Sequence, residues 1–247
     1  MKYKIIKLLK IHYLWRFLKK NITKKNYITE WNIFIEKYKL IYFPIPKIAC
    51  SSIKSTMIKL LEENINNKKY ENKIIKIHST KFPFIKRKEI WNYNNYIKFA
   101  FVRNPYDRIV SCYKNLLKDI SLNNSYFING VPKSFLYKWN FTYNMSFKEF
   151  VTEISKISDN DSDWHFISQY KYLVNSEWNL EPEYIWRFEN LNNDLEKILK
   201  KAWINWIKLP HLLKSNRKNY KEYYDNETKK IVTERYKRDL ELFNYTF

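Results

Sequence analysis

The sequence predicts an α/β domain in which helices pack on a β-sheet. Short apolar runs alternate along the chain with segments whose apolar residues recur at helical spacing. The chain has 247 residues, no internal repeat and no Pro/Gly/Ser-rich linker, which favours a single domain with a sizeable core. We place this domain at residues 39–247 and interpret residues 1–38 as a basic, amphipathic N-terminal extension.

The first half of the predicted domain contains three strands. The first strand covers 40–43 and is followed by a helix with an apolar stripe from Ile53 to Ile65, capped by Ser51 or Ser52. The second covers 74–77 and ends at His78. The third, 97–102, is nearly all apolar, as expected for a strand that is covered on both faces.

The second half begins with a helix that Asn104 caps and that has Pro105 at its first position. Residues 118–145 show no clear period, so we interpret them as a long loop or lid. A capping box from Ser146 to Glu149 predicts the next helix. A strand over 184–188, a helix over 191–201 and a final helix from Asn226 through Phe243 complete the prediction.

Composition excludes several kinds of site. Gly130 is the only glycine, which rules out the G-x-G-x-x-G dinucleotide motif and the G-x-x-x-x-G-K-[ST] nucleotide loop. Two cysteines are too few for a disulfide scaffold or a four-cysteine zinc site. The four histidines lie too far apart in sequence to form a local metal motif, so we expect no metal.

The formal net charge is +21, which favours a polyanionic partner or reflects a lysine-rich, solvated surface. Residues 1–20 mix apolar and basic side chains, and they form either an amphipathic helix on a membrane surface or a helix packed on the domain. They contain neither the unbroken apolar run of a signal peptide nor a membrane span. We therefore expect a cytoplasmic protein, with peripheral membrane contact as the alternative.

Two turns have the layout of anion-binding sites. After the strand 40–43, Lys47 provides an ammonium group, Ser51 and Ser52 provide hydroxyls, and Lys54 adds a charge on the first turn of the following helix. Such a turn directs backbone N–H groups and the positive end of a helix at one point. This is a phosphate-binding loop built without glycine.

The second turn follows the strand 97–102. Arg103 offers a forked guanidinium at the end of this strand, and Ser111 lies two helical turns beyond Asn104 on the same face. Two such turns after neighbouring strands predict a ligand with two separated anionic groups.

These turns resemble the donor-binding motifs of a known family. Residues 46–54, P-K-I-A-C-S-S-I-K, are similar to the 5′-phosphosulfate loop P-K-x-A-x-[TS]-[SN]-x-K of the carbohydrate sulfotransferases of the chondroitin, dermatan and HNK-1 type, known as sulfotransferase family 2. Residues 101–113, F-V-R-N-P-Y-D-R-I-V-S-C-Y, resemble that family's 3′-phosphate motif F-x-R-[ND]-P-[FY]-x-R-[LI]-x-S-x-[YF].

Three weaker matches reach the C-terminus. Residues 164–169 resemble D-x-H-W-x-P-Q, with the Trp and His in a different order and no proline. Residues 184–191 resemble the strand F-[IV]-x-R-[FY]-E-x-L, and 239–245 resemble D-x-x-x-F-G-Y with Asn in place of Gly. The resemblance begins at about residue 40.

The resemblance implies a single parallel-sheet domain related to the P-loop nucleotide kinases. It also implies transfer of a sulfuryl group from 3′-phosphoadenosine 5′-phosphosulfate (PAPS) to a carbohydrate hydroxyl. Lys47 would stabilise the leaving phosphate. The residues expected around the 5′-phosphosulfate are Lys47, Ile48, Ala49, Cys50, Ser51, Ser52 and Lys54. Arg103 and Ser111 would bind the 3′-phosphate, and Arg217 and Lys218 either close over it or form a solvated basic loop.

A general base would accept the proton of the acceptor hydroxyl. His78 is the first choice, because it directly follows a predicted strand and resembles a histidine of the related heparan 2-O-sulfotransferases. His165 is the second choice. A cleft lined by Lys, Arg, Tyr and Trp suits an acidic saccharide, with 118–145 as the lid on the acceptor side.

Two other functions compete with this interpretation. A kinase-like enzyme would need an acidic metal ligand after a strand, and the sequence offers none. A non-enzymatic protein that binds acidic membranes or nucleic acid would use the net charge alone. The paired motifs favour the sulfotransferase and no specific nucleic-acid partner.

Overall fold

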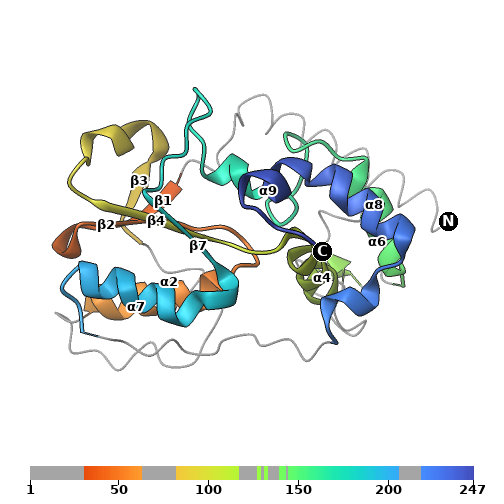
Figure 1. Cartoon of the computed structure of the whole chain (residues 1–247), viewed down its shortest axis with the longest axis horizontal. Helices are drawn as coiled ribbons and strands as arrows, with labels where there is room; N and C mark the ends of the chain where they lie inside the picture. The colour runs from red at the N-terminus through yellow and green to blue at the C-terminus, as the bar shows by residue number, and fades with distance from the viewer. Residues whose placement is uncertain are drawn as a thin grey trace.

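Figure 1 shows the computed structural model of the chain; the structure describes residues 31–62, 82–116, 127–128, 131–132, 139–142, 144–205 and 218–247. A five-stranded sheet forms its centre, with strand order β3-β1-β2-β4-β7. Its strands are β1 (Trp31–Ile35), β2 (Leu40–Phe43), β3 (Phe84–Lys86), β4 (Ile97–Val102) and β7 (Tyr184–Arg187). A separate antiparallel pair consists of β5 (Phe127–Ile128) and β6 (Val131–Pro132).

The sheet is mixed, which corrects the prediction of a parallel sheet. β2, β4 and β7 are parallel, whereas β1 is antiparallel to both β2 and β3. The reason is the short connection from β1 to β2, a 3₁₀ turn η1 (Glu36–Tyr38) followed by Lys39 at a φ of 50°, which reverses the chain at once. β1 also lies inside the expected N-terminal extension, so residues 31–35 belong to the sheet.

Two groups of helices surround the sheet (Figure 1). α2 (Cys50–Glu62) and α7 (Leu191–Lys201) both lie below the sheet in this view. The others gather beyond the point where β4 runs into α4: α4 (Pro105–Leu116), α6 (Phe147–Ser155), α8 (Asn226–Arg235) and α9 (Lys237–Leu242). Four further 3₁₀ turns are η3 (Arg87–Asn92), η4 (Gln169–Tyr172), η5 (Phe188–Asn190) and η6 (Tyr220–Tyr223).

Several predicted elements are confirmed. β2, β4 and α7 have the predicted bounds, and Ser146 and Glu149 form the predicted capping box at the start of α6. The final helix is divided into α8 and α9, because Tyr236 leaves helical geometry with φ −118° and ψ 22°. Its buried hydroxyl donates to the Phe166 carbonyl at 2.8 Å, which anchors the break.

Other predictions fall outside the described residues. They are the strand over 74–77 with His78, most of the lid 118–145, and residues 1–20 with their membrane contact. No helix within the described ranges is both long and apolar enough to cross a bilayer.

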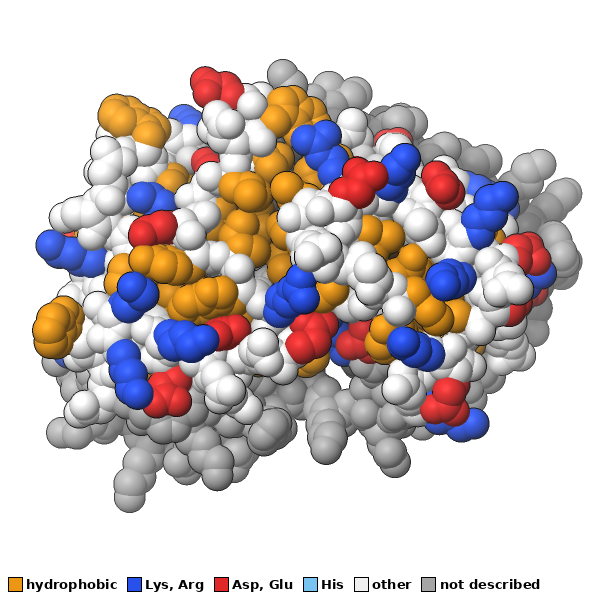
Figure 2. Space-filling model, viewed as in Figure 1, with side chains coloured by type: hydrophobic (Ala, Val, Ile, Leu, Met, Phe, Trp, Pro, Cys, Tyr) orange, Lys and Arg blue, Asp and Glu red, His pale blue; other side chains and the backbone are white. Residues whose placement is uncertain are grey.

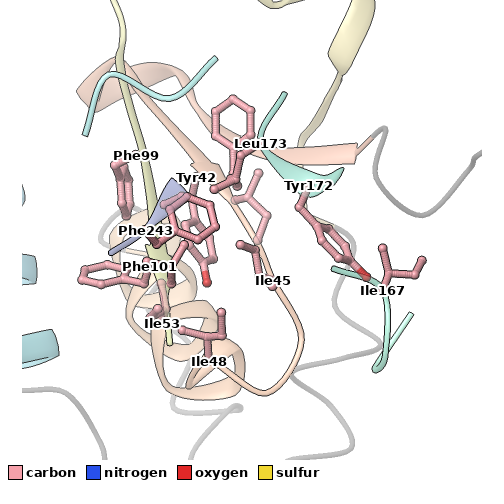
Figure 3. Packing of buried hydrophobic residues seen from close by; sticks show 14 of the residues in the cluster. Tyr42, Ile45, Ile48, Ile53, Phe99, Phe101, Ile167, Tyr172, Leu173 and Phe243 are labelled. Atoms are coloured by element: carbon pink, nitrogen blue, oxygen red, sulfur yellow. The ribbon is translucent and has the colours of Figure 1, made fainter. Parts of the chain in front are cut away.

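The hydrophobic core fixes the loop after β2 to the rest of the domain. Ile45 and Ile48 of this loop are fully buried, as are Phe99 and Phe101 of β4. Figure 3 shows Ile45 between the sheet and the segment that contains Ile167, and Ile48 beside Ile53 of α2. The loop is therefore anchored by its apolar side chains at two positions that flank Lys47.

Basic side chains are dispersed on the face shown in Figure 2. Lys and Arg alternate there with acidic and hydrophobic side chains and do not gather in one patch. On this face, the excess positive charge is a distributed property of the surface.

Candidate functional site

The turn between β2 and α2 has an unusual backbone. Lys47 and Ala49 have φ values of 69° and 47°, in the left-handed region that non-glycine residues rarely adopt. The first helical hydrogen bond runs from the Ile53 N–H to the Ala49 carbonyl at 3.0 Å. The first turn of α2 therefore presents its N–H groups to this loop, as an anion-binding turn requires.

The predicted cap of α2 is wrong. The helix begins at Cys50, so Ser51 and Ser52 lie inside its first turn and are buried. The left-handed Ala49 turns the chain into the helix, which begins two residues earlier than a Ser51 cap would place it.

The strain at Ala49 gives a testable expectation. A non-glycine residue in the left-handed region costs the folded state about 1–2 kcal/mol, and glycine removes this cost. Glycine also increases the conformational entropy of the unfolded chain, which reduces the net gain in stability. We expect Ala49→Gly to stabilise the fold by about 0.5–1 kcal/mol in urea unfolding. Ala202→Gly is the matched control, because Ala202 has a φ of −86° and glycine should destabilise there. Equal effects of the two substitutions would contradict this explanation.

The second turn is built as predicted, and it touches the first. The Asn104 Oδ1 atom accepts a hydrogen bond from the Tyr106 N–H at 3.1 Å, which caps α4. The Arg103 Nη1 atom donates to the Lys47 carbonyl at 2.8 Å. The two predicted anion-binding turns are thus held together by a direct hydrogen bond.

The Arg103 guanidinium has further partners. Its Nε and Nη2 atoms each lie 2.7 Å from Asp107 Oδ2, and its plane lies over the Phe188 ring at 4.3 Å. The side chain is only 8% exposed. Arg103 therefore holds the two turns together. Its contact with a 3′-phosphate stays a prediction. A bound phosphate would compete with Asp107 for the guanidinium.

The other predicted donor ligands lie around these turns. Cys50 is half-buried at the start of α2, and Lys54 is half-buried one turn later, with burial lowering the pKa of its ammonium. Ser111 is half-buried on α4. Lys218 is exposed before η6, a turn that packs on α4, and its Nζ lies 3.8 Å from Glu222. Arg217 lies outside the described residues.

The Gln169 side chain makes two hydrogen bonds to the backbone of Arg103, directly after β4. Its side-chain Oε1 accepts from the Arg103 N–H and its Nε2 donates to the Arg103 carbonyl, both at 2.9 Å. Asp239 in turn accepts from the Gln169 and Tyr170 N–H groups at 2.7 and 2.9 Å. Sequence patterns alone indicate no role for either side chain, although each belongs to a quoted motif.

The Asp239 carboxyl gives a pH-dependent expectation. Burial raises its pKa to about 6, and its two backbone hydrogen bonds partly oppose this shift. A raised folded-state pKa contributes stability below about pH 4, and this contribution is lost as the pH rises through about 6. We expect Asp239→Asn to remove up to about 1.4 kcal/mol per pH unit from the slope of unfolding free energy between these values. Identical slopes for wild type and variant in urea titrations would contradict the shift.

Arg108 joins the first turn to a third segment. This side chain is 1% exposed; its Nε donates to the Pro46 carbonyl at 3.1 Å and its Nη1 to the Ile167 carbonyl at 2.9 Å. Pro46 directly precedes Lys47, and Ile167 follows His165 by two residues. Arg108 therefore holds the His165 segment beside the Lys47 loop.

His165 is paired with a carboxylate. Its Nδ1 lies 2.6 Å from Asp163 Oδ1, and its backbone carbonyl accepts from the Cys112 thiol at 3.2 Å. The pair orients the ring and leaves Nε2 as the nitrogen for a ligand. Burial raises the pKa of the Cys112 thiol, and the positive charges of Arg108, Lys47 and Arg103 oppose this shift.

Glu189 and Tyr245 complete the support of the second turn. Glu189 accepts from the Asn104 N–H at 3.2 Å through one oxygen and from the Tyr245 hydroxyl at 2.8 Å through the other. Arg187 donates to the carbonyls of Phe243 and Asn244. No group of three or more His, Cys, Asp or Glu side chains able to hold a metal occurs in the described part of the chain.

Comparison with known proteins identifies the family. A sequence model described as the Sulfotransferase family matches residues 32–246. The chain belongs to this family. It is 24% identical over 238 residues to carbohydrate sulfotransferase 11 of Rattus norvegicus and to that of Mus musculus, in each case over 85% of this chain and 66% of the relative. The chain thus spans slightly less than two thirds of these relatives.

Another relative has a higher sequence identity to the chain over a shorter aligned length. Carbohydrate sulfotransferase 14 of Mus musculus is 33% identical over 89 residues, 34% of this chain and 23% of the relative. No solved structure matches the chain.

One family motif matches the chain more closely when it is aligned from Asp163. When D-x-H-W-x-P-Q is aligned from Asp163, His165 and Gln169 fall at the His and Gln positions, and Phe166 replaces the Trp. In this alignment the Trp and His positions are not reversed. The paired side chains, Asp163 and His165, are both motif positions.

Proposed function

We propose that this chain is a PAPS-dependent carbohydrate O-sulfotransferase. The observation that supports this most directly is the 2.8 Å hydrogen bond from Arg103 to the Lys47 carbonyl. It makes one site of two turns that each suit an anionic group, and PAPS has anionic groups at both ends of its ribose. Membership in the Sulfotransferase family supports the same donor.

The donor is bound by both turns in this proposal. The 5′-phosphosulfate lies at the Lys47 loop and the first turn of α2, where backbone N–H groups and the charges of Lys47 and Lys54 stabilise it. The 3′-phosphate lies at the second turn, near Ser111, Lys218 and the start of α4. This second contact distinguishes PAPS from a nucleotide that lacks the 3′-phosphate.

The reaction is an in-line transfer with most charge on the leaving side. The acceptor oxygen forms a bond to sulfur, while the bond from sulfur to the 5′-phosphate oxygen breaks. The acceptor proton passes to His165 Nε2, and adenosine 3′,5′-bisphosphate leaves with its new negative charge beside Lys47. Asp163 positions the His165 ring and stabilises its protonated form.

The acceptor is an acidic carbohydrate in this proposal. The chain has a net charge of +21 and is 19% aromatic, a composition that suits uronic-acid or sulfated sugars. His78 remains the alternative base.

Transfer of labelled sulfate tests the function. Wild-type protein is incubated with [³⁵S]PAPS and desulfated chondroitin, hyaluronan or neutral dextran, without added metal. We expect label in an acidic polysaccharide and little in dextran. Transfer of phosphate from ATP instead, or salt-sensitive nucleic-acid binding with no sulfate transfer, would overturn the proposal.

A further inference from the structure

An exposed tryptophan adjoins the proposed base. The Trp164 ring is 41% exposed, and its centroid lies 4.8 Å from that of His165 at an interplanar angle of 64°. We propose that Trp164 is the acceptor platform, on which the apolar face of a pyranose ring stacks so that one hydroxyl meets His165. This inference rests on the proposed function and adds a residue that determines acceptor binding.

The main chain around Trp164 is held firmly. Its carbonyl accepts from the Tyr172 hydroxyl at 2.6 Å, and Tyr172 is 4% exposed. The next carbonyl, that of His165, accepts from the buried Cys112 thiol. Two buried donors thus fix the backbone that carries the exposed ring, and Trp has only two side-chain torsions to order when a ligand binds.

The ring also suits a sugar by its chemistry. An indole has a large apolar face and one N–H donor, so it can pack against the C–H face of a pyranose and still contact a hydroxyl. The His165 nitrogen left by the Asp163 pairing lies on the adjacent ring. A sugar on Trp164 therefore lies next to the group that accepts its proton.

The other exposed tryptophans of the described ranges have different surroundings. Two cations, Lys171 and Arg238, lie 4.8 and 4.6 Å from the Trp178 centroid. Trp91 is on η3 beside the edge strand β3, and Trp203 follows the end of α7. Among these four, Trp164 is the one that contacts His165.

Acceptor kinetics test the inference. Trp164→Ala, Trp164→Phe and the control Trp91→Ala, at a site 72% exposed, are compared with wild type, using desulfated chondroitin hexasaccharide as the acceptor. We expect Trp164→Ala to raise KM for the hexasaccharide at least about tenfold, with Trp164→Phe and Trp91→Ala within about threefold of wild type. The Kd of adenosine 3′,5′-bisphosphate and the thermal midpoint should stay unchanged in all three.

The outcomes separate this inference from the proposed function. An unchanged hexasaccharide KM in Trp164→Ala, with sulfate transfer intact, overturns the platform alone. A tenfold rise in both Trp164→Ala and Trp91→Ala also overturns it, because the effect is then not local. Failure of the wild-type protein to bind adenosine 3′,5′-bisphosphate or to sulfate the hexasaccharide overturns both the platform and the function on which it rests.

Discussion

Lys47→Ala is expected to lower kcat for sulfuryl transfer about 10²–10³-fold, the usual effect of removing one group that stabilises a developing anion. Lys47 lies in the left-handed turn between the buried residues Ile45 and Ile48, so its backbone position is fixed. In the loose transition state, charge accumulates on the oxygen that leaves sulfur, and the Lys47 ammonium stabilises that charge more than it stabilises bound PAPS.

The matched control for this substitution is Lys59→Ala. Lys59 is exposed on α2, the same helix that the loop precedes, and its removal changes net charge equally. The measurement is the initial rate with [³⁵S]PAPS at saturating donor and acceptor. Equal rates for the two variants would show that only the overall charge matters, and Lys47 would have no place in the mechanism.

His165→Asn is the second large effect, with an expected loss of about 10²–10⁴ in kcat, the range for a general base. Asn retains a polar group that can reach Asp163 but cannot accept the acceptor proton. Asp163→Asn should lower kcat by about tenfold or more with an unchanged donor KM, because it alters only the orientation and charge of the imidazole.

His78→Asn distinguishes the two proposed bases. If His165 is the base, His78→Asn should keep most of the kcat. A full-size loss in His78→Asn together with near wild-type activity in His165→Asn would assign the base to His78. Thermal midpoints within a few degrees of wild type would show that each variant is folded.

Local sequence patterns were sufficient for the elements whose boundaries have strong chemical markers. β4 is apolar except for Lys98 and is followed by Arg103, and α6 begins with its capping box at Ser146. The break at Tyr236 was not visible, because apolar spacing continues through it and the cause is a hydrogen bond to Phe166, 70 residues away. The antiparallel β1 was missed because its sequence was assigned to the extension.

The site shows the same division. Both turns were predicted from residue types next to strand ends, and both are present. The contacts that join the two turns and the Ile167 segment are not predictable from local patterns, because they link positions far apart in the chain. Arg103 and Lys47 are 56 residues apart, and Arg108 and Ile167 are 59 residues apart. Both arginines were in the quoted motif, and only the fold shows that they act as braces.

Calorimetric titration with adenosine nucleotides tests most directly whether the two turns bind a single donor. Wild-type protein is titrated with adenosine 3′,5′-bisphosphate, 5′-AMP and adenosine 3′-monophosphate at fixed salt. We expect one bisphosphate per chain and at least about tenfold weaker binding of each monophosphate, because each loses one charge-assisted contact. If 5′-AMP binds as tightly as the bisphosphate, or if the bisphosphate does not bind, the Lys47 and Arg103 turns do not form a shared donor site.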